Sequence, residues 1–282
     1  MLTLDSAMGM FIGLAVGDAL GAPLEFTDAR EPKDYITKYH TGGWHDVDKG
    51  EWTDDTAMAL AMAQAFIDNE GEFNPAGIMH NWSRWYNAGE FIPRGKCFDI
   101  GGTTQRAIDI YDKIHTVYNG VSLATEAGNG ALMRIAPVVI VSSTPERAME
   151  LAVSQTIMTH GSPEAIEYSR VFAHELWHGT ALQRYNSYKL PDNIEREKVM
   201  SGGHVVETYQ CAMWAFSTTS TFADCVIKAV NRGHDSDTCG AVAGMIAGAH
   251  YGFNGIPSEF TKDLMWYKEL CRAAIKLHQL GR

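Results

Sequence analysis

Two apolar segments near opposite ends of the chain carry glycine at every fourth position, and this repeat constrains the fold more than any other feature. The glycines are Gly9, Gly13, Gly17 and Gly21 in the first segment and Gly240, Gly244, Gly248 and Gly252 in the second. On an α-helix this spacing places them along one side. Because a glycine weakens an exposed helix by about 1 kcal/mol relative to alanine, the repeat indicates close backbone contact between buried helices.

A pair of membrane helices can show the same spacing of small residues. Here Asp18 and the run Asp235 to Asp237 interrupt the apolar stretches. The interruptions come too early for a membrane span, which needs about 20 apolar residues. We therefore expect two core helices of a soluble protein and no membrane partner.

Helix-start signals recur in the rest of the chain. Thr144-Pro145-Glu146 and Ser162-Pro163-Glu164 each combine an N-cap residue, a proline and an acid, and Asn74-Pro75 is a weaker case. Val138 to Val141 is the best strand candidate, but no alternating strand pattern with hairpin turns appears. We expect an all-α, compact, single-domain helical bundle over residues 1–282, with Tyr185 to Gly203 as a surface connection.

Composition excludes some partners. The chain has 282 residues, 45% of them hydrophobic and 20% charged, and a formal net charge of −11, which suits a soluble globular protein. Because nucleic acids are held mainly by Lys and Arg, we expect no nucleic-acid partner. A small phosphate compound can still bind where metal ions and backbone N–H groups supply positive potential.

The cysteines and the first residues bear on the compartment. The five cysteines are widely spaced and form no C-x-x-C pair, which is typical of a reducing compartment. Residues 1–5 (MLTLD) include no basic residue, so we expect no signal peptide. The prediction is a cytoplasmic protein, and we expect it to be a monomer.

Two acidic clusters carry the strongest chemical signal. They read Thr53-Asp54-Asp55-Thr56 and Asp235-Ser236-Asp237-Thr238, and each precedes a run of small apolar residues. Helix capping explains one or two acids at a helix start. Buried carboxylates without partners, however, cost several kcal/mol each, and the nearby Lys49 and Arg232 are too few to neutralise four aspartates.

Hard oxygen ligands of this kind suit Mg²⁺, Mn²⁺ or Ca²⁺ better than a structural zinc ion. Two such ions sharing the clusters could orient a diol and activate water. Glu25 follows the helix break at Pro23 and is a third candidate for this site. The alternative is that Glu25 is simply solvated beyond the break.

A competing motif lies in the middle of the chain. His174-Glu175-Leu176-Trp177-His178 matches the H-E-x-x-H pattern of zinc proteases. Its extended form is absent because Gly179 follows His178 directly. Glu195 or Glu197 could serve as a third ligand, but both lie in a polar stretch without a clear helical frame. A zinc metalloprotease remains an alternative.

Six ordered segments together resemble the ADP-ribosylglycohydrolase family, and within it most closely the branch that contains the dinitrogen-reductase-activating glycohydrolase. The segments are GLAVGDALGAPLEF, GEWTDDTAMALAMA, DIGGTTQRAI, EAGNGALMRIAP, IMTHGSPEA and NRGHDSDTCGAVAGMIAGAHYG. The resemblance covers nearly the whole chain. It implies an all-α fold and a centre of two divalent cations, Mg²⁺ or Mn²⁺.

The resemblance also implies roles for individual residues. Family metal ligands fall on Thr53, Asp54, Asp55, Asp235, Asp237 and Thr238. Catalytic carboxylates fall on Glu25 and Asp99. Substrate contacts are expected at Gly101, Gly102, Thr103, Gly128, Asn129, Gly130, His160 and His204. His204 replaces a tyrosine of the related branch and Gly102 replaces a larger residue, which leaves the acceptor and the adenosine contacts open.

The expected function is removal of ADP-ribose from a modified protein. The substrate would be an ADP-ribosylated protein and the product ADP-ribose. Arginine is the first choice of acceptor, with serine or another residue as the alternative. A catalytically inactive ADP-ribose-binding protein is the third hypothesis, although no expected metal ligand is replaced.

Overall fold

The computed structural model describes residues 2–121, 126–179 and 194–282. Within these ranges the chain is helical and contains no β-strand, only isolated β-bridges, which confirms the all-α prediction. The α-helices are α1 (Leu4–Gly21), α2 (Asp54–Asp68), α3 (Pro75–Ala88), α4 (Gly102–Ile114), α5 (Ala136–Ile140), α6 (Pro145–Thr156), α7 (Pro163–His178), α8 (Val205–Ser217), α9 (Phe222–Val230), α10 (Ser236–Tyr251), α11 (Ser258–Asp263) and α12 (Tyr267–Leu280). Short 3₁₀ helices are η1 (Ala22–Leu24), η2 (Pro32–Asp34), η4 (Arg196–Lys198) and η5 (Phe253–Gly255).

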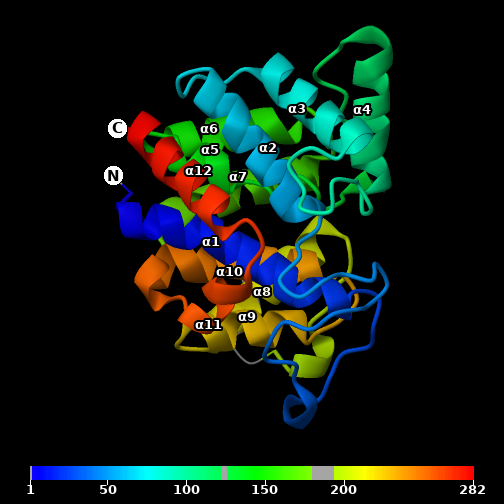
Figure 1. Ribbon diagram of the computed structural model, residues 1–282, viewed down its shortest axis with the longest axis vertical. Coiled ribbons are helices and arrows are strands. Elements are labelled where there is room, and N and C mark those ends of the chain that lie inside the picture. Colours follow the sequence, from blue (N-terminus) through cyan, green and yellow to red (C-terminus); the bar gives the residue numbers. More distant parts are fainter. Residues whose placement is uncertain (1, 122–125, 180–193) are drawn as a thin grey trace.

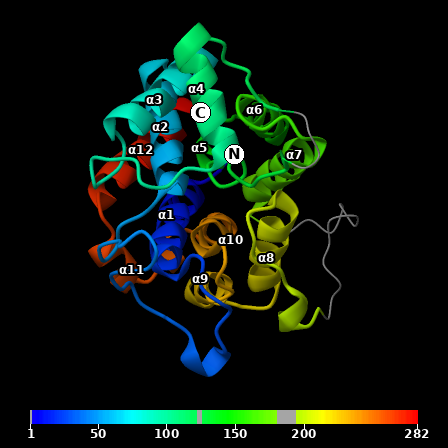
Figure 2. The same ribbon diagram turned by 90° about the vertical axis from the view of Figure 1, so that its right-hand side faces the viewer.

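Helices α1 and α10 form the centre of the molecule, side by side (Figures 1 and 2). Helices α2, α3, α4 and α12 lie on one side of this pair, and α8, α9 and α11 lie on the other (Figure 1). The segment Leu4–Leu24 is apolar enough to cross a membrane, with a mean hydropathy of 1.5, but 94% of that window is buried inside the protein. It is therefore a core helix in this fold.

The glycine repeat sets the distance between α1 and α10. A Cβ atom added to Gly13 would lie 2.2 Å from the carbonyl oxygen of Gly244, and one added to Gly17 would lie 1.9 Å from that of Gly240. Such contacts are impossible for any larger residue, so the glycines allow backbone-to-backbone packing. Gly9 meets Gly248 in the same way.

These pairs run in opposite directions along the two helices, so α1 and α10 are antiparallel. The C-terminal end of α1 therefore lies beside the N-terminal end of α10: a Cβ atom on Gly21 would meet the backbone of Ser236 and Asp237. Asp18, near the end of α1, is thus brought to the start of α10. This antiparallel register determines where the candidate site forms.

The helix-start signals are confirmed. The side chains of Thr144 and Ser162 accept hydrogen bonds from the backbone N–H groups of Arg147 and Ala165 at the starts of α6 and α7. Asn74 caps α3 in the same way. Each cap satisfies one of the N–H groups that the first helical turn leaves without a partner.

The best strand candidate in the sequence, Val138 to Val141, does not form a strand, in agreement with the all-α prediction. Val138 to Ile140 belong to α5, and Val141 is the residue after its last turn. Pro137 stands in the first turn, where its fixed φ and missing N–H group favour a helix start. Because this segment is buried on every side, its continuous apolar run does not distinguish a helix from a strand.

The predicted surface connection, Tyr185 to Gly203, is only partly described. Residues 185–193 lie outside the described residues. The remainder includes η4, where Glu195 and Glu197 are exposed.

Candidate active site and metal centre

The two acidic clusters meet where three elements converge. Asp54 and Asp55 occupy the first turn of α2, and Asp237 occupies the first turn of α10. The end of α1 contributes Asp18, which is fully buried. Since helix N-termini carry partial positive charge, the starts of α2 and α10 favour the carboxylates gathered there.

Asp18 takes the place of a side-chain N-cap for α2. Thr53 precedes that helix but makes no capping bond of its own. Instead Asp18 Oδ1 accepts from Thr53 N (2.9 Å), and Asp18 Oδ2 accepts from Thr56 N (3.0 Å) and Thr56 Oγ1 (2.6 Å). A residue of α1 thereby fixes the orientation of the Thr53–Thr56 cluster.

Side-chain oxygens crowd together beneath this cap. Thr53 Oγ1 lies 3.0 Å from Asp18 Oδ1, 3.3 Å from Asp55 Oδ2 and 3.2 Å from Asp237 Oδ2. A hydroxyl group has one proton to donate, so it cannot satisfy three carboxylates. Carboxylate oxygens of Asp18, Asp55 and Asp237 lie within 4.8 Å of one another. The cluster requires further protons or cations.

Burial makes that requirement stronger. It raises the pKa values of Asp54, Asp55 and Asp237 well above the ordinary range, and the charges of neighbouring carboxylates raise them further. The pKa of Asp18 is raised to about 6 by burial, although its hydrogen bonds to Thr53 and Thr56 oppose the shift. Four neighbouring carboxyl groups with raised pKa values indicate that the ionised cluster needs positive charge nearby.

The cationic side chains nearest in sequence do not supply it. Lys49 pairs with Asp263 at 2.7 Å, and Arg232 donates to the carbonyl oxygen of Val199. Asp55 Oδ1 is buried and has no hydrogen-bond partner within the part of the chain that the structure describes. An all-oxygen donor set with an unused carboxylate oxygen fits a hard divalent cation such as Mg²⁺ or Mn²⁺.

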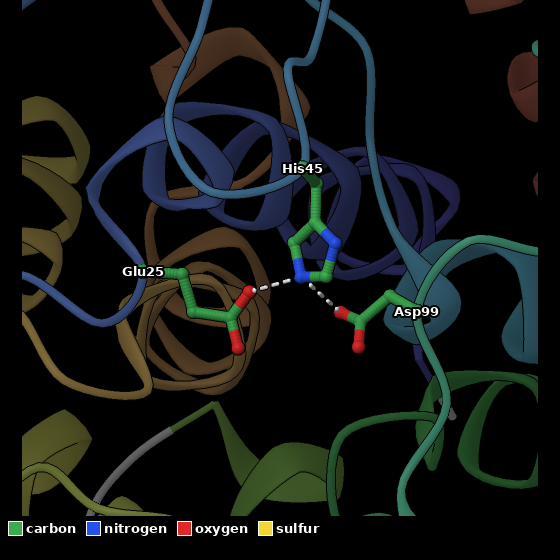
Figure 3. Close-up of side chains that lie close together, drawn as sticks. All are labelled: Glu25, His45 and Asp99. Carbon is green, nitrogen blue, oxygen red and sulfur yellow. Dashed lines mark ion pairs between the residues drawn. The ribbon is translucent and has the colours of Figure 1, made fainter.

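Glu25 and Asp99 lie on either side of a histidine that sequence reasoning did not identify. His45 Nε2 is 2.9 Å from Glu25 Oε2 and 3.7 Å from Asp99 Oδ2. Figure 3 shows the imidazole ring between the two carboxylates. Burial raises the pKa of Asp99 to about 7, with the charge of Glu25 adding to the shift. Burial also raises the pKa of Glu25, against the opposing effect of His45.

The loop that carries His45 is held by an ion pair between a partly exposed arginine and a buried glutamate. Arg94 donates to both carboxylate oxygens of Glu51, which is almost fully buried. The same guanidinium donates to the backbone carbonyls of His45 and Asp46 at 2.9 and 3.0 Å. Arginine thus fixes the backbone position of His45, and with it the spacing between Glu25 and Asp99.

A cavity of about 340 Å³ opens above these acids. It contains nearly all of the predicted substrate-binding residues. Its lining includes Glu25, Phe26, Asp54, Asp99, Ile100, Gly101, Gly102, Thr103, Thr104, Gly128, Asn129, Gly130, Met133, His160, Gly203, Asp235, Asp237 and Thr238. None of the lining residues that the structure describes is Lys or Arg. Among these residues, positive potential must therefore come from backbone N–H groups or bound ions.

The N-terminus of α4 supplies such N–H groups. Gly101 precedes the helix, and Gly102 and Thr103 form its first turn at the cavity wall. The N–H groups of a first turn have no intrahelical acceptor, which makes a helix start a natural anion site. A Cβ atom at Gly101 or Gly102 would meet open space, so both backbones are accessible from the cavity.

The turn Gly128-Asn129-Gly130 forms another wall, and here the absence of side chains has a specific reason. A Cβ atom on Gly130 would lie 3.0 Å from the ring of His160, and one on Gly128 would lie 3.3 Å from its Nε2 atom. Asn129 Nδ2 donates to Asp235 Oδ2 at 2.8 Å. The turn therefore connects the buried histidine with the second acidic cluster.

His204 occupies the edge of the site. Its backbone forms an isolated bridge with Gly128, but its side chain lies 3.4 Å from Glu164 Oε2. His204 is absent from the cavity lining, whereas Gly203 belongs to it. A substrate contact through the His204 side chain stays a prediction.

The H-E-x-x-H segment lies on α7, apart from the cavity. Glu175 is buried and accepts hydrogen bonds from Tyr209 Oη at 2.9 and 2.8 Å. The rings of His174 and His178 contact each other, with centroids 4.7 Å apart. A buried glutamate bonded to a tyrosine favours a structural role over that of a water-activating base.

Comparison with known proteins agrees with this geometry. A family model described as ADP-ribosylglycohydrolase matches residues 1–282. ADP-ribosylarginine hydrolase Tri1 of Serratia proteamaculans (strain 568) is 32% identical over 299 residues, covering 99% of this chain and 80% of that protein. ADP-ribosyl-[dinitrogen reductase] glycohydrolase of Rhodospirillum rubrum is 33% identical over 279 residues, covering 92% and 90%. A solved "ADP-ribosylglycohydrolase-related protein complex" chain superposes with a TM-score of 0.84 at 31% identity, covering 99% of both chains.

Proposed function

This chain belongs to the ADP-ribosylglycohydrolase family and is a glycohydrolase, and we propose that it releases ADP-ribose from modified arginine side chains of proteins. The main structural support for hydrolysis is the junction of α1, α2 and α10, where buried carboxylates gather beside a cavity. The name of the relative at 32% identity refers to ADP-ribosylarginine, and the name of the relative at 33% identity refers to ADP-ribosyl dinitrogen reductase. Serine or another acceptor is the alternative.

We propose that two divalent cations, Mg²⁺ or Mn²⁺, are held at this junction. The ligands would be Thr53, Asp54, Asp55, Asp235, Asp237 and Thr238. Burial raises the pKa values of Asp54, Asp55 and Asp237 among them, which calls for added positive charge. When bound, such ions would supply the charge that orients a ribose diol and makes water more acidic.

The cavity walls would hold the rest of the substrate. The N–H groups of Gly102 and Thr103 at the start of α4 suit the diphosphate, which accepts hydrogen bonds from helix N-termini. The turn at Gly128 and Gly130 lines the cavity and packs closely against His160, because neither residue has a side chain. His160 lines the cavity between these walls.

Glu25 and Asp99 would exchange the protons of the reaction. Hydrolysis breaks the bond between the anomeric carbon and the acceptor nitrogen, and it adds water across that bond. One carboxyl group donates a proton to the leaving nitrogen and the other takes a proton from water. Asp99, with a pKa raised to about 7, can be protonated near neutral pH. His45 keeps both groups in place.

The proposal is tested by incubating the protein with arginine-linked and serine-linked ADP-ribosyl peptides, with Mg²⁺ or Mn²⁺ or with a chelator, and measuring free ADP-ribose by chromatography. We expect metal-dependent release from the arginine-linked peptide. Asp235→Asn should lower the rate by about 100-fold, because replacing even the outer partners of metal ligands costs about 10- to 100-fold.

Glu175→Gln is the matched control, because it retains the buried contact with Tyr209 while removing the base of a zinc protease. Its rate of ADP-ribose release should equal that of the unmodified protein. Loss of activity in Glu175→Gln together with stoichiometric zinc would support the metalloprotease. Binding of ADP-ribose without release from either peptide would support an inactive binding protein.

A further inference from the structure

Two exposed aromatic residues stand at the mouth of the cavity. Phe26 is 61% exposed and Trp44 is 76% exposed. Their rings contact edge to face, with centroids 5.6 Å apart at 77°. Phe26 follows Glu25 directly and lines the cavity, while Trp44 directly precedes His45. The ring pair, called here the aromatic platform, therefore lies immediately outside the candidate acid–base groups.

The backbone holds Phe26 in a costly conformation. Its φ angle is +59°, in the left-handed region that residues with side chains rarely adopt. Phe26 N donates to His234 O (2.7 Å), and His234 N donates to Thr27 O (2.8 Å). His234 is itself left-handed, with φ of +55°. Such strain persists where the surroundings impose it, and it concentrates at functional sites.

This conformation makes two neighbouring side chains point in opposite directions. Glu25 is directed inward, where only 8% of its side chain is exposed, and Phe26 is directed outward. An ordinary loop would bury a phenylalanine ring in preference to a carboxylate. The segment therefore keeps an apolar ring in water beside the site, which calls for a ligand that covers it.

Charge identifies the chemistry of that ligand. The carboxylates of Glu25, Asp54, Asp99, Asp235 and Asp237 line the cavity, and Lys and Arg are absent from the described part of its lining. Cations are attracted both to such a wall and to aromatic faces. A planar cation fits the mouth better than a neutral group.

We propose that the aromatic platform binds the guanidinium group of an ADP-ribosylated arginine and so selects arginine-linked over serine-linked substrates. This inference rests on the proposed function, and it names the acceptor for the same site. A guanidinium placed against Phe26 and Trp44 gains cation–π contact, and its glycosidic nitrogen points toward Glu25 and Asp99. A serine linkage is neutral and gains neither the cation–π contact nor the attraction of the acidic wall.

Substitution of the rings tests the inference. Phe26→Leu and Trp44→Leu remove the π faces but keep apolar side chains of moderate size. We expect kcat/KM for an arginine-linked peptide to fall about tenfold, while kcat/KM for a serine-linked peptide and the affinity for free ADP-ribose stay unchanged. Phe26→Tyr should retain most of the arginine activity.

Phe91→Leu is the matched control. Phe91 is also an aromatic residue with a left-handed φ, +61°, but it does not belong to the cavity lining. Its replacement should leave both substrates unaffected. An equal loss for arginine-linked and serine-linked peptides in Phe26→Leu would overturn the inference, because a neutral peptide contact or a general structural defect would explain it.

A direct binding measurement separates this inference from the proposed function. The indole N–H resonance of Trp44 can be assigned by its disappearance in Trp44→Phe. Addition of methylguanidinium should shift it, whereas the neutral methylurea should not. If the protein released ADP-ribose from neither peptide, the proposed function would fail, and this titration would still decide on the platform. Equal responses to both probes, or no response, would overturn it.

Discussion

His160 receives its orientation from two residues behind it. Arg134 is fully buried, lies 4.0 Å from the centre of the Trp82 ring, and donates to Thr159 Oγ1 at 2.6 Å. Thr159 Oγ1 is in turn 2.8 Å from His160 Nδ1. Since arginine can only donate, the threonine proton remains for His160 Nδ1. The ring proton is then carried by Nε2, the atom that faces Gly128 and the cavity.

The His160 ring is also uncharged. Burial, and secondarily the charge of Arg134, lower the pKa of His160 to about 3. A neutral ring with Nε2–H offers a hydrogen-bond donor at the cavity wall.

Replacement of Thr159 by valine should therefore weaken binding of ADP-ribose about fivefold. The change keeps the side-chain volume but removes the hydroxyl that selects the tautomer, and one hydrogen bond contributes roughly 1 kcal/mol. Calorimetric titration measures the affinity, and nitrogen chemical shifts of His160 measure the tautomer. Thr159→Ser should restore both.

Thr156→Val provides the comparison. It removes a hydroxyl that is equally buried but is bonded to Ala152 O and Gln155 rather than to His160. An affinity loss in Thr156→Val as large as that in Thr159→Val would mean that packing, and not the tautomer, controls binding.

At the residue scale the sequence revealed the acids at helix starts but not their partners. Asp54 and Asp237 could be recognised because local helix chemistry explains their positions only in part. Asp18 was noticed only as an interruption of an apolar stretch. An acid inside a helix expected to be buried was nevertheless a usable signal, because it must find donors. His45 and Arg94 gave no local signal, since their contacts depend on distant segments.

At the scale of elements, the crossing of α1 and α10 controls the site. Gly13 and Gly244 face each other so closely that a Cβ atom on either would lie within 2.2 Å of the other's carbonyl oxygen. Any shift of one helix along the other would separate Asp18 from Asp237. The helix pair is therefore part of the architecture of the acidic cluster.

Gly13→Ala should accordingly destabilise the protein strongly. One methyl group forces the helices apart, and overpacking of this kind costs roughly 3 kcal/mol or more. Thermal or urea unfolding measures the change in the free energy of unfolding. Gly102→Ala is the stability control, because a Cβ atom there meets open space. Similar unfolding midpoints for Gly13→Ala and the unmodified protein would contradict the close packing.

The elements were predictable to the degree that their signals were local. Caps at Thr144 and Ser162 act within one turn, and the glycine repeat is a property of single helices. The sequence did not disclose that the two repeats pair with each other in antiparallel register. Val138 to Val141 was the best strand candidate for a related reason: its β-branched residues prefer strands, and burial by other elements, which outweighs that preference, gives no local signal.

At the scale of the whole molecule, the chain is acidic overall and also buries several of its carboxylates together. The net charge is −11, yet Asp18, Asp54, Asp55 and Asp237 are buried together. The starts of α2 and α10 offset part of the repulsion. The remainder must be offset by protons or by metal ions, and the two compete for the same oxygens.

Stability without metal should therefore fall as pH rises. Asp18 and Asp99 have pKa values raised from 3.8 to about 6 and about 7 in the folded protein. Between about pH 4 and pH 7 the folded state then binds more protons than the unfolded state, so the free energy of unfolding decreases with pH across this window. We expect the melting temperature in the presence of a chelator to be higher at pH 5 than at pH 8.

Metal ions should reverse this trend where the carboxylates are ionised. A ligand that binds only the folded state raises the melting temperature by mass action, and the proposed cations would bind the deprotonated acids. Addition of Mg²⁺ or Mn²⁺ should therefore raise the melting temperature more at pH 8 than at pH 5, where protons occupy the same oxygens. Scanning calorimetry at both pH values, with chelator and with metal, measures the four states. A chelated protein that gained stability from pH 5 to pH 8, or a metal effect independent of pH, would show that the buried carboxylates are not the metal ligands.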